Sequence, residues 1–161
     1  MAAPSTYSKT QIALHWVIAA MVFFQLIFNE GIEELWEART EGSALNVQLA
    51  NPHVVIGMVI AVLVVWRIWL RLSRGAPPPH AEEPPALRLV ASATHILFYT
   101  LLLLMPLSGG LAWFGGFEQA ARFHGLLEKV LIPLIALHVV GALAQHFIFR
   151  SNALKRIFGM G

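Results

Sequence analysis

The chain has 161 residues, of which 57% are hydrophobic and only 12% are charged. A water-soluble domain of this length could not bury so much apolar side chain, so the composition predicts a surface that faces lipid. The net charge of +2 therefore does not indicate nucleic-acid binding. Since the chain has no cysteine, disulfides, iron–sulfur ligation by thiolates and C-x-x-C-H haem attachment are excluded.

Four apolar runs approach or exceed the roughly 20 residues that a helix needs to cross a bilayer. Their approximate limits are 11–29, 53–72, 91–114 and 124–149. The first run ends in Phe28, Asn29 and Glu30 without a small-x-small cleavage site, so we interpret it as a retained helix. The sequence predicts an all-α integral membrane protein, a four-helix bundle that forms one domain over residues 1–161.

The connections between the runs predict the orientation in the membrane. The first connection is acidic, with a single basic residue, Arg39, among Glu30, Glu33, Glu34, Glu37 and Glu41. Basic residues gather at the second connection, which is rich in proline, and in the C-terminal tail: Arg67, Arg71, Arg74, Arg88, Arg150, Lys155 and Arg156. The positive-inside rule then places both termini in the cytoplasm. An even number of crossings follows, so we expect up-down-up-down order.

Histidine is the residue type that points to a function. An ionisable side chain near the middle of a bilayer costs about 2.5 kcal/mol or more when charged, so such residues are rare and usually functional. Five lie within the runs or at their edges: His15, His53, His95, His124 and His138. The last two are fourteen residues apart on one predicted helix, which places them on nearly the same face and about 21 Å apart.

Because the chain alternates direction, His53 and His124 should lie at the same level near the outer surface. Toward the cytoplasm, His138 has two candidate partners, His15 and His95, and depth alone does not decide between them. Two imidazole pairs stacked across the membrane are typical of two haems whose axial positions are both filled. Such haems carry electrons, since the iron has no site open for oxygen chemistry.

Motifs over nearly the whole chain resemble bacterial cytochrome b561, the family that includes membrane superoxide:quinone oxidoreductases. The most specific motif is the spacing of fourteen between the last two membrane histidines. Other matching residues are Tyr7, Ser8, Gln11, Ile12, Leu14, His15 and Trp16 near the start, then His53 with Gly57, Arg67 with Arg71, His95 with Tyr99, Pro106 and Gly109, and finally His124, His138, Ala142, Ala144 and His146.

The resemblance implies two haems b, with His53 and His124 as the outer ligands and His15 and His138 as the inner ligands. It also implies a bacterial inner-membrane protein that exchanges electrons with the quinone pool, ubiquinone being the expected acceptor. His95 and His146 would lie near a quinone or support a ligand, and Arg67 and Arg71 could pair with haem propionates. The alternatives are a structural hydrogen bond for His95, a headgroup-level position for His146, and membrane anchoring for the arginines.

Three functional hypotheses follow. The first is transfer of electrons to quinone, with superoxide as a possible donor, although the acidic first connection would repel an anion. The second is a haem-carrying subunit of a larger complex that receives electrons from a periplasmic protein. The third is a haem-free proton or metal-ion transporter, which is disfavoured because the carboxylates lie outside the apolar runs. The sequence gives no oligomeric state.

Overall fold

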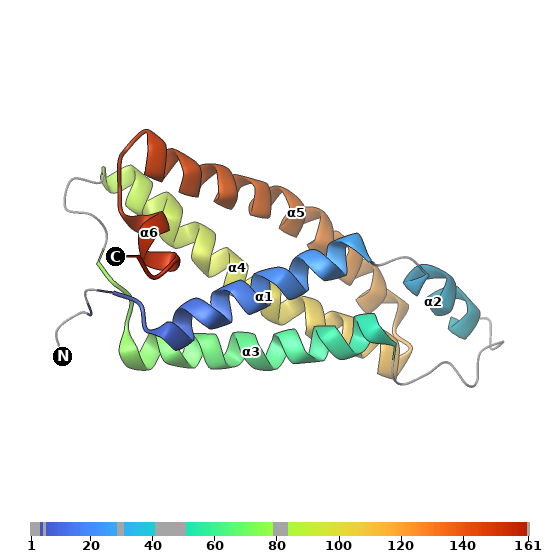
Figure 1. The fold of residues 1–161 in the computed structure, drawn as a ribbon. Helices are drawn as coiled ribbons and strands as arrows, with labels where there is room; N and C mark the ends of the chain where they lie inside the picture. The colour runs from blue at the N-terminus through green and yellow to red at the C-terminus, as the bar shows by residue number, and fades with distance from the viewer. Residues whose placement is uncertain (1–3, 5, 29–30, 41–50, 79–83, 161) are drawn as a thin grey trace.

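A computed structural model describes residues 4, 6–28, 31–40, 51–78 and 84–160. Within these ranges the chain is helical and contains no strand. The helices, which can be followed along the chain in Figure 1, are α1 (Lys9–Ile27), α2 (Ile32–Thr40), α3 (Pro52–Arg74), α4 (Pro85–Gly115), α5 (Glu118–Phe147) and α6 (Ala153–Ile157).

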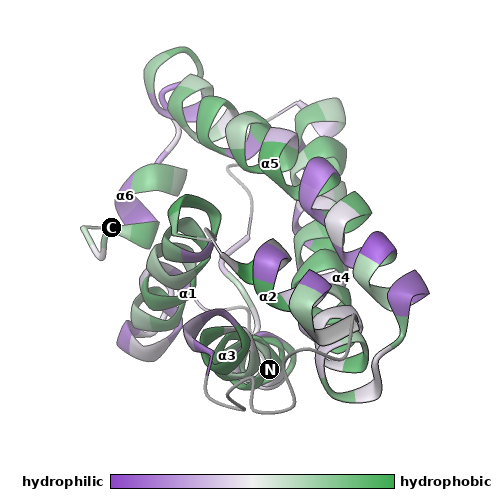
Figure 2. Cartoon of the chain, turned by 90° about the vertical axis from the view of Figure 1, so that its right-hand side faces the viewer, coloured by the Kyte–Doolittle hydropathy of each residue, from purple (hydrophilic) through white to green (hydrophobic). Residues whose placement is uncertain are grey.

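Four of these helices, α1, α3, α4 and α5, are long and apolar enough to cross a membrane. Hydrophobic residues cover their outward surfaces as well as their contacts with one another (Figure 2). Leu72, Val62 and Phe147, for example, are 80%, 68% and 71% exposed. Apolar side chains exposed at this scale would be unstable in water, and this confirms the prediction of an all-helical membrane protein.

The long helices begin earlier than the apolar runs predicted. In α1, Ser8 and Gln11 form a capping box, in which each side chain bonds the other's backbone N–H. Asn51 caps α3 by accepting a hydrogen bond from the His53 N–H at 2.8 Å. The largest differences are in α4 and α5, which start at Pro85 and Glu118 rather than at 91 and 124.

Each long helix packs mainly against the next one in the chain: α1 on α3, α3 on α4 and α4 on α5. Separate apolar clusters fill these contacts. One contains Ile18, Ile60 and Val64, and the other contains Leu101, Leu127, Leu131 and Leu134. Helices α1 and α5 are not closely packed along their backbones. Their facing sides are therefore free to present functional side chains to each other.

Hydrogen bonds at the two ends of α1 show how it lies against α3. Near its start, the Gln11 amide donates to the Gly75 carbonyl after the end of α3, at 3.0 Å. Near its end, the Gln25 amide donates to the His53 carbonyl at the start of α3, at 2.7 Å. The orientation of the bundle across a bilayer stays a prediction.

The structure contains two short helices that the apolar runs did not predict. Helix α2 lies within the acidic first connection, at the end of the bundle opposite α6 (Figure 1). Trp113, near the end of α4, is only 3% exposed, because it packs inside the bundle. Parts of two predicted connections lie outside the described residues, namely Glu30, Glu41 and the segment 79–83, and so does Asn29, near the predicted end of the first run.

Candidate functional site

The first pair of histidines joins α3 to α5. His53 lies near the start of α3 and His124 lies near the start of α5. Their ring centroids are 6.0 Å apart and the ring planes are inclined at 70°. Both side chains are partly buried. The structure therefore brings together the two residues that the sequence predicted as the outer pair.

The ring of His124 is held by helix α4. Its Nδ1 lies 2.8 Å from the Met105 carbonyl oxygen, which can only accept, so Nδ1 carries the proton. The Ser108 hydroxyl lies 3.3 Å from the same nitrogen. Gly109 makes this approach possible, because a Cβ there would lie 3.1 Å from the ring. Nε2 is left as the nitrogen available to a ligand, an arrangement typical of metal-binding histidines.

His53 differs from His124 because its Nδ1 is buried and has no hydrogen-bond partner among the described residues. The neighbouring side chain is that of Gln25 on α1, whose amide nitrogen already donates to the His53 carbonyl. The Gln25 Oε1 is likewise buried without a partner within the described part of the chain. One buried acceptor on Gln25 and one ring nitrogen of His53 able to donate thus both remain without a partner in the described part of the chain.

A second group of histidines lies between α1, α4 and α5. The centroid of His138 on α5 is 6.4 Å from that of His15 on α1 and 5.6 Å from that of His95 on α4. Phe98 packs edge-on against His138 at 5.2 Å. Both candidates that the sequence left open for the inner level are therefore close to His138.

The two inner candidates are held differently. The Nδ1 of His95 lies 2.7 Å from the Ala91 carbonyl one turn earlier, so it carries the proton and only Nε2 can act as a ligand. His15 packs edge-on against Trp16, with centroids 5.1 Å apart. Neither arrangement excludes its residue as a ligand, and the choice of His15 stays a prediction.

The spacing of the rings fits an iron between them. An imidazole nitrogen lies about 2 Å from a metal ion that it binds, and the ring centroid about 1 Å further, so two rings on opposite sides of one ion have centroids about 6 Å apart. The observed values are 6.0 Å for His53 with His124 and 6.4 Å for His15 with His138. Beside His138, a Cβ at Gly141 would meet nothing within 4 Å, so this face of α5 is open.

Haem fits these residues better than a free metal ion does. Among the residues that the structure describes, no group of three histidine or acidic side chains is arranged to hold a metal ion. A porphyrin supplies four ligands itself and asks the protein only for the axial pair. Such a cofactor requires two imidazoles on helices that are not closely packed against each other, and both histidine pairs meet this condition.

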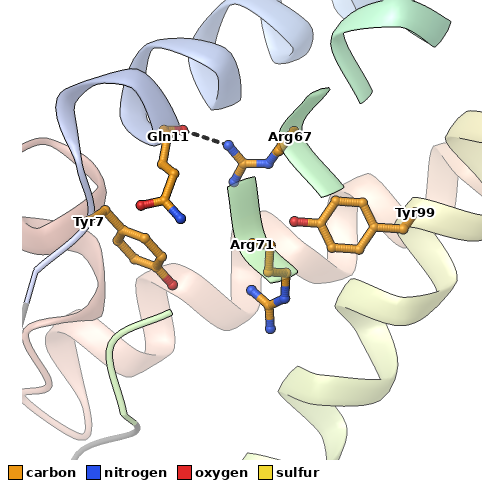
Figure 3. A pocket seen from close by; sticks show the side chains of 5 residues that line it. All are labelled: Tyr7, Gln11, Arg67, Arg71 and Tyr99. Atoms are coloured by element: carbon orange, nitrogen blue, oxygen red, sulfur yellow. Dashed lines mark hydrogen bonds between the residues drawn. The ribbon is translucent and has the colours of Figure 1, made fainter. Parts of the chain in front are cut away.

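The predicted arginines lie close to the inner histidines. Arg67 is near enough to His15, His95 and His138 to act on all three electrostatically. The Arg67 guanidinium also donates to the Gln11 carbonyl at 2.6 Å, and that of Arg71 lies 5.9 Å from the centre of the Tyr99 ring. Figure 3 shows these side chains around a small pocket.

His146 lies apart from the inner group. Its ring packs edge-on against Phe147, with centroids 4.8 Å apart, and its Nδ1 is buried without a partner among the described residues. Within the same part of the chain, no ring contact joins it to another histidine. The structure thus does not connect His146 with the predicted ligands, and its role near a quinone remains a prediction.

Comparison with known proteins agrees with this geometry. The sequence model of the family described as prokaryotic cytochrome b561 matches residues 6–160. The chain belongs to this family. A cytochrome b562 of Cereibacter sphaeroides is 34% identical over 155 residues, covering 94% of each chain. A cytochrome b561 homologue of Escherichia coli K12 is 28% identical over 94% of this chain and 96% of its own.

A third relative of this cytochrome b561, from Yersinia pestis, is described as the probable superoxide oxidase CybB. It is 27% identical over 172 residues, covering 94% of each chain. Family membership confirms the resemblance identified from the motifs. A prokaryotic cytochrome b561 with four helices that can span a membrane is a bacterial membrane protein of electron transfer, and the family name implies haem b.

Two residues that support the site were missed by the sequence analysis. Gln25 and Ser108 contact the predicted outer ligands, but neither was singled out. A signal was present, because each is a polar residue in a long apolar run, where an unsatisfied hydrogen-bonding group is costly. The third missed contact, the Met105 carbonyl, belongs to the backbone and has no signature in the sequence.

Proposed function

We propose that this chain is a dihaem b cytochrome of the bacterial inner membrane, which carries electrons through the bilayer to or from the quinone pool. His53 and His124 would hold the outer haem, and His15 and His138 the inner haem. The observation that carries this proposal is the presence of two imidazole pairs, each with the spacing that one iron requires. On α5 the two ligands are separated by about 21 Å along the helix.

A bound haem b supplies reversible one-electron chemistry at its iron. The protein's own contribution is to fix the ligands and to lower the polarity around them. The Met105 carbonyl fixes the orientation of His124 by accepting a hydrogen bond from its Nδ1–H, and this also raises the basicity of Nε2. The buried leucines of α4 and α5 and the edge of Phe98 exclude water from the space between the two levels. With a histidine pair holding each iron, a bound haem would favour electron transfer over binding of oxygen.

The decisive experiment is a haem assay combined with a dithionite-reduced minus oxidised spectrum. We expect two haems b per chain in the wild type and one in each of the variants His53→Ala and His138→Ala. Leu137→Ala, an exposed residue beside His138, serves as the control and should retain both. One haem in the wild type would contradict the proposal of two sites.

A comparison of His15→Ala with His95→Ala identifies the inner ligand. We expect the first substitution to remove the inner haem and the second to leave it bound with an altered spectrum, because His95 would be a neighbour rather than a ligand. The opposite result would assign the inner iron to His95 and His138, whose spacing of 5.6 Å is also short enough.

The second part of the proposal concerns the electron donor and the electron acceptor. The family relationship to a probable superoxide oxidase supports superoxide as donor, with ubiquinone as acceptor. The exposed Glu34 and Glu37 of α2 should slow the approach of this anion. Stopped-flow mixing of the oxidised protein with superoxide tests this: Glu34→Gln should accelerate haem reduction at low salt. If superoxide reduces neither form, the donor must be another molecule.

The acidic helix α2 also favours a second candidate, in which a basic periplasmic protein of a larger complex is the electron donor. Its exposed carboxylates are arranged on a helix that lies beyond the end of the long helices (Figure 1). Charge complementarity of this kind speeds association. A partner that co-purifies at low salt and dissociates at high salt, and that binds Glu34→Gln more weakly, would support this role.

A further inference from the structure

A pocket at the start of α1 is lined by two positively charged side chains, Arg67 and Arg71. It is lined by Tyr7, Gln11, Arg67, Arg71 and Tyr99, and it is a small hollow that is partly open to the surroundings. Figure 3 shows the two guanidinium groups and the two phenol rings gathered around the same space. Among the residues that the structure describes, no carboxylate lines it. Two positive charges therefore face one hollow without a countercharge from the described part of the chain.

Hydrogen bonds make the walls of this pocket rigid. The Gln11 side chain is 5% exposed and is bonded at both of its polar atoms, because its amide nitrogen donates to the Gly75 carbonyl and its oxygen accepts from the Ser8 N–H, both at 3.0 Å. The Gln11 carbonyl in turn accepts one N–H of Arg67. One donor of the Arg67 fork is thus committed to the backbone, which holds the guanidinium in place while its other N–H groups remain available.

The arginines have no acidic partner within the described residues, where the only ion pair joins Arg122 to Glu118. Arg71 instead lies over the ring of Tyr99, a cation–π contact that fixes its position but does not neutralise its charge. Both arginines are partly buried. Partly buried cations are stable when they are paired, so a pairing group of opposite charge is missing from this part of the chain.

We propose that this pocket binds an oxyanion, a carboxylate or phosphate group held between Arg67 and Arg71. Guanidinium forks bind such groups through two parallel hydrogen bonds, and a phenol hydroxyl can add a third. Because the hollow is small and partly open, the anionic group would enter it while the rest of the molecule that carries the group stays outside.

Two kinds of molecule could place a carboxylate or phosphate group in this pocket. One is an anionic phospholipid, because Arg71 lies in the last turn of α3, at a helix end where headgroups lie, and basic pockets between membrane helices bind their phosphates. The other is haem b at the inner site, since Arg67 bonds the Gln11 carbonyl one turn before His15, and Arg71 lies over Tyr99 one turn after His95. Only this second source rests on the proposed function.

The test compares Arg71→Leu with Arg74→Leu in the purified full-length protein. Both variants lose one positive charge from the same end of α3, but Arg74 is exposed and does not line the pocket. Arg71→Lys keeps the charge and loses the planar fork, so it replaces Arg71→Leu if that variant fails to fold. Tyr99→Phe removes one hydroxyl and keeps the ring.

Two measurements separate the sources. Native mass spectrometry in phosphatidylglycerol compared with phosphatidylcholine counts tightly bound anionic lipid. The propionate bands of the resonance Raman spectrum report hydrogen bonds to haem carboxylates. We expect Arg71→Leu, but not Arg74→Leu, to lose at least one bound phosphatidylglycerol if the anion is a lipid phosphate, or to shift a propionate band if it is a carboxylate.

Either selective change would support an oxyanion site and would name its source. Equal behaviour of the wild type, Arg71→Leu and Arg74→Leu in both measurements would overturn it. If the protein contains no haem, the Raman measurement has no signal and the proposed function fails, but the lipid count still decides whether the pocket binds an anion.

Discussion

At the scale of single residues, the outer histidine pair depends on a glycine. A Cβ at Gly109 would lie 3.1 Å from the His124 ring, closer than side chains normally pack. We expect Gly109→Ala to displace the ring, to destabilise the protein by about 1–3 kcal/mol as overpacking does, and to weaken binding of the outer haem. Haem content and the thermal midpoint of the purified protein measure both effects.

The neighbouring glycine provides a matched control. A Cβ at Gly110 would meet only Phe114, at an ordinary distance of 4.0 Å. Gly110→Ala should therefore keep the haem content and the thermal midpoint of the wild type. Equal losses in the two variants would mean that helix α4 as a whole, rather than the approach of His124, is sensitive to the substitution.

Gln25 makes a second prediction at this scale, because its amide bonds the His53 backbone and its Oε1, like the His53 Nδ1, is buried without a partner among the described residues. A ligand histidine is normally oriented by an acceptor at this nitrogen, and the loss of such a partner typically weakens metal binding about 10- to 100-fold. We expect Gln25→Leu to release the outer haem at least about tenfold faster than the wild type does, measured by transfer to an apoprotein that captures free haem. Gln25→Glu keeps an acceptor and should release the haem more slowly than Gln25→Leu does.

The release of the inner haem serves as the internal reference for this experiment. If Gln25→Leu accelerates the release of both haems equally, then Gln25 supports the packing of α1 against α3 and does not orient His53.

At the scale of elements, the C-terminal segment connects α5 with α1. The chain turns back at Arg150, whose φ of 52° is in the left-handed region, and α6 then packs on α5. The Trp16 indole donates to the Ile157 carbonyl at 3.0 Å and packs against the Phe158 ring at 4.8 Å. Since α1 and α5 are not closely packed along their backbones, this segment helps to set the distance between His15 and His138.

Deletion of residues 152–161 should therefore weaken binding of the inner haem selectively and leave the outer haem in place. Trp16→Phe is a milder version, because it keeps the aromatic contact and loses one hydrogen bond worth about 1 kcal/mol. The redox titration of each haem checks this, with Trp66→Phe as the control, since Trp66 is 46% exposed. Loss of the outer haem alone would contradict a role for the segment at the inner level.

At the scale of the whole molecule, the prediction that both termini are cytoplasmic can be tested because the chain contains no cysteine. Single cysteines at the exposed positions Glu34 and Asn152 can be labelled without background. In intact cells, a maleimide that does not cross the inner membrane should label Glu34→Cys and should leave Asn152→Cys unlabelled until the cells are opened. The reverse pattern would invert the bundle and exchange the two haem levels.

The sequence by itself determined the number of spanning helices and the family. Both are local properties: hydrocarbon thickness dictates the length of each apolar run, and the spacing of fourteen places His124 and His138 on one face of any α-helix. Helix ends were less predictable, because α4 and α5 continue past charged residues, through Arg88 in α4 and through Glu118 and Arg122 in α5. All four residues now proposed as ligands were named from the sequence, but the choice of His15 over His95 rested on the family resemblance and not on local spacing.

Only the tertiary structure decided which helices face one another and how closely. That His15 and His95 both lie beside His138, that Gly109 admits the His124 ring, and that Arg67 and Arg71 share a pocket with Tyr7 and Tyr99 depend on how each helix is rotated about its axis. In a chain whose helices are apolar on all sides, hydrophobic periodicity does not fix this rotation. It is set by small residues, hydrogen bonds and side-chain packing between distant parts of the chain.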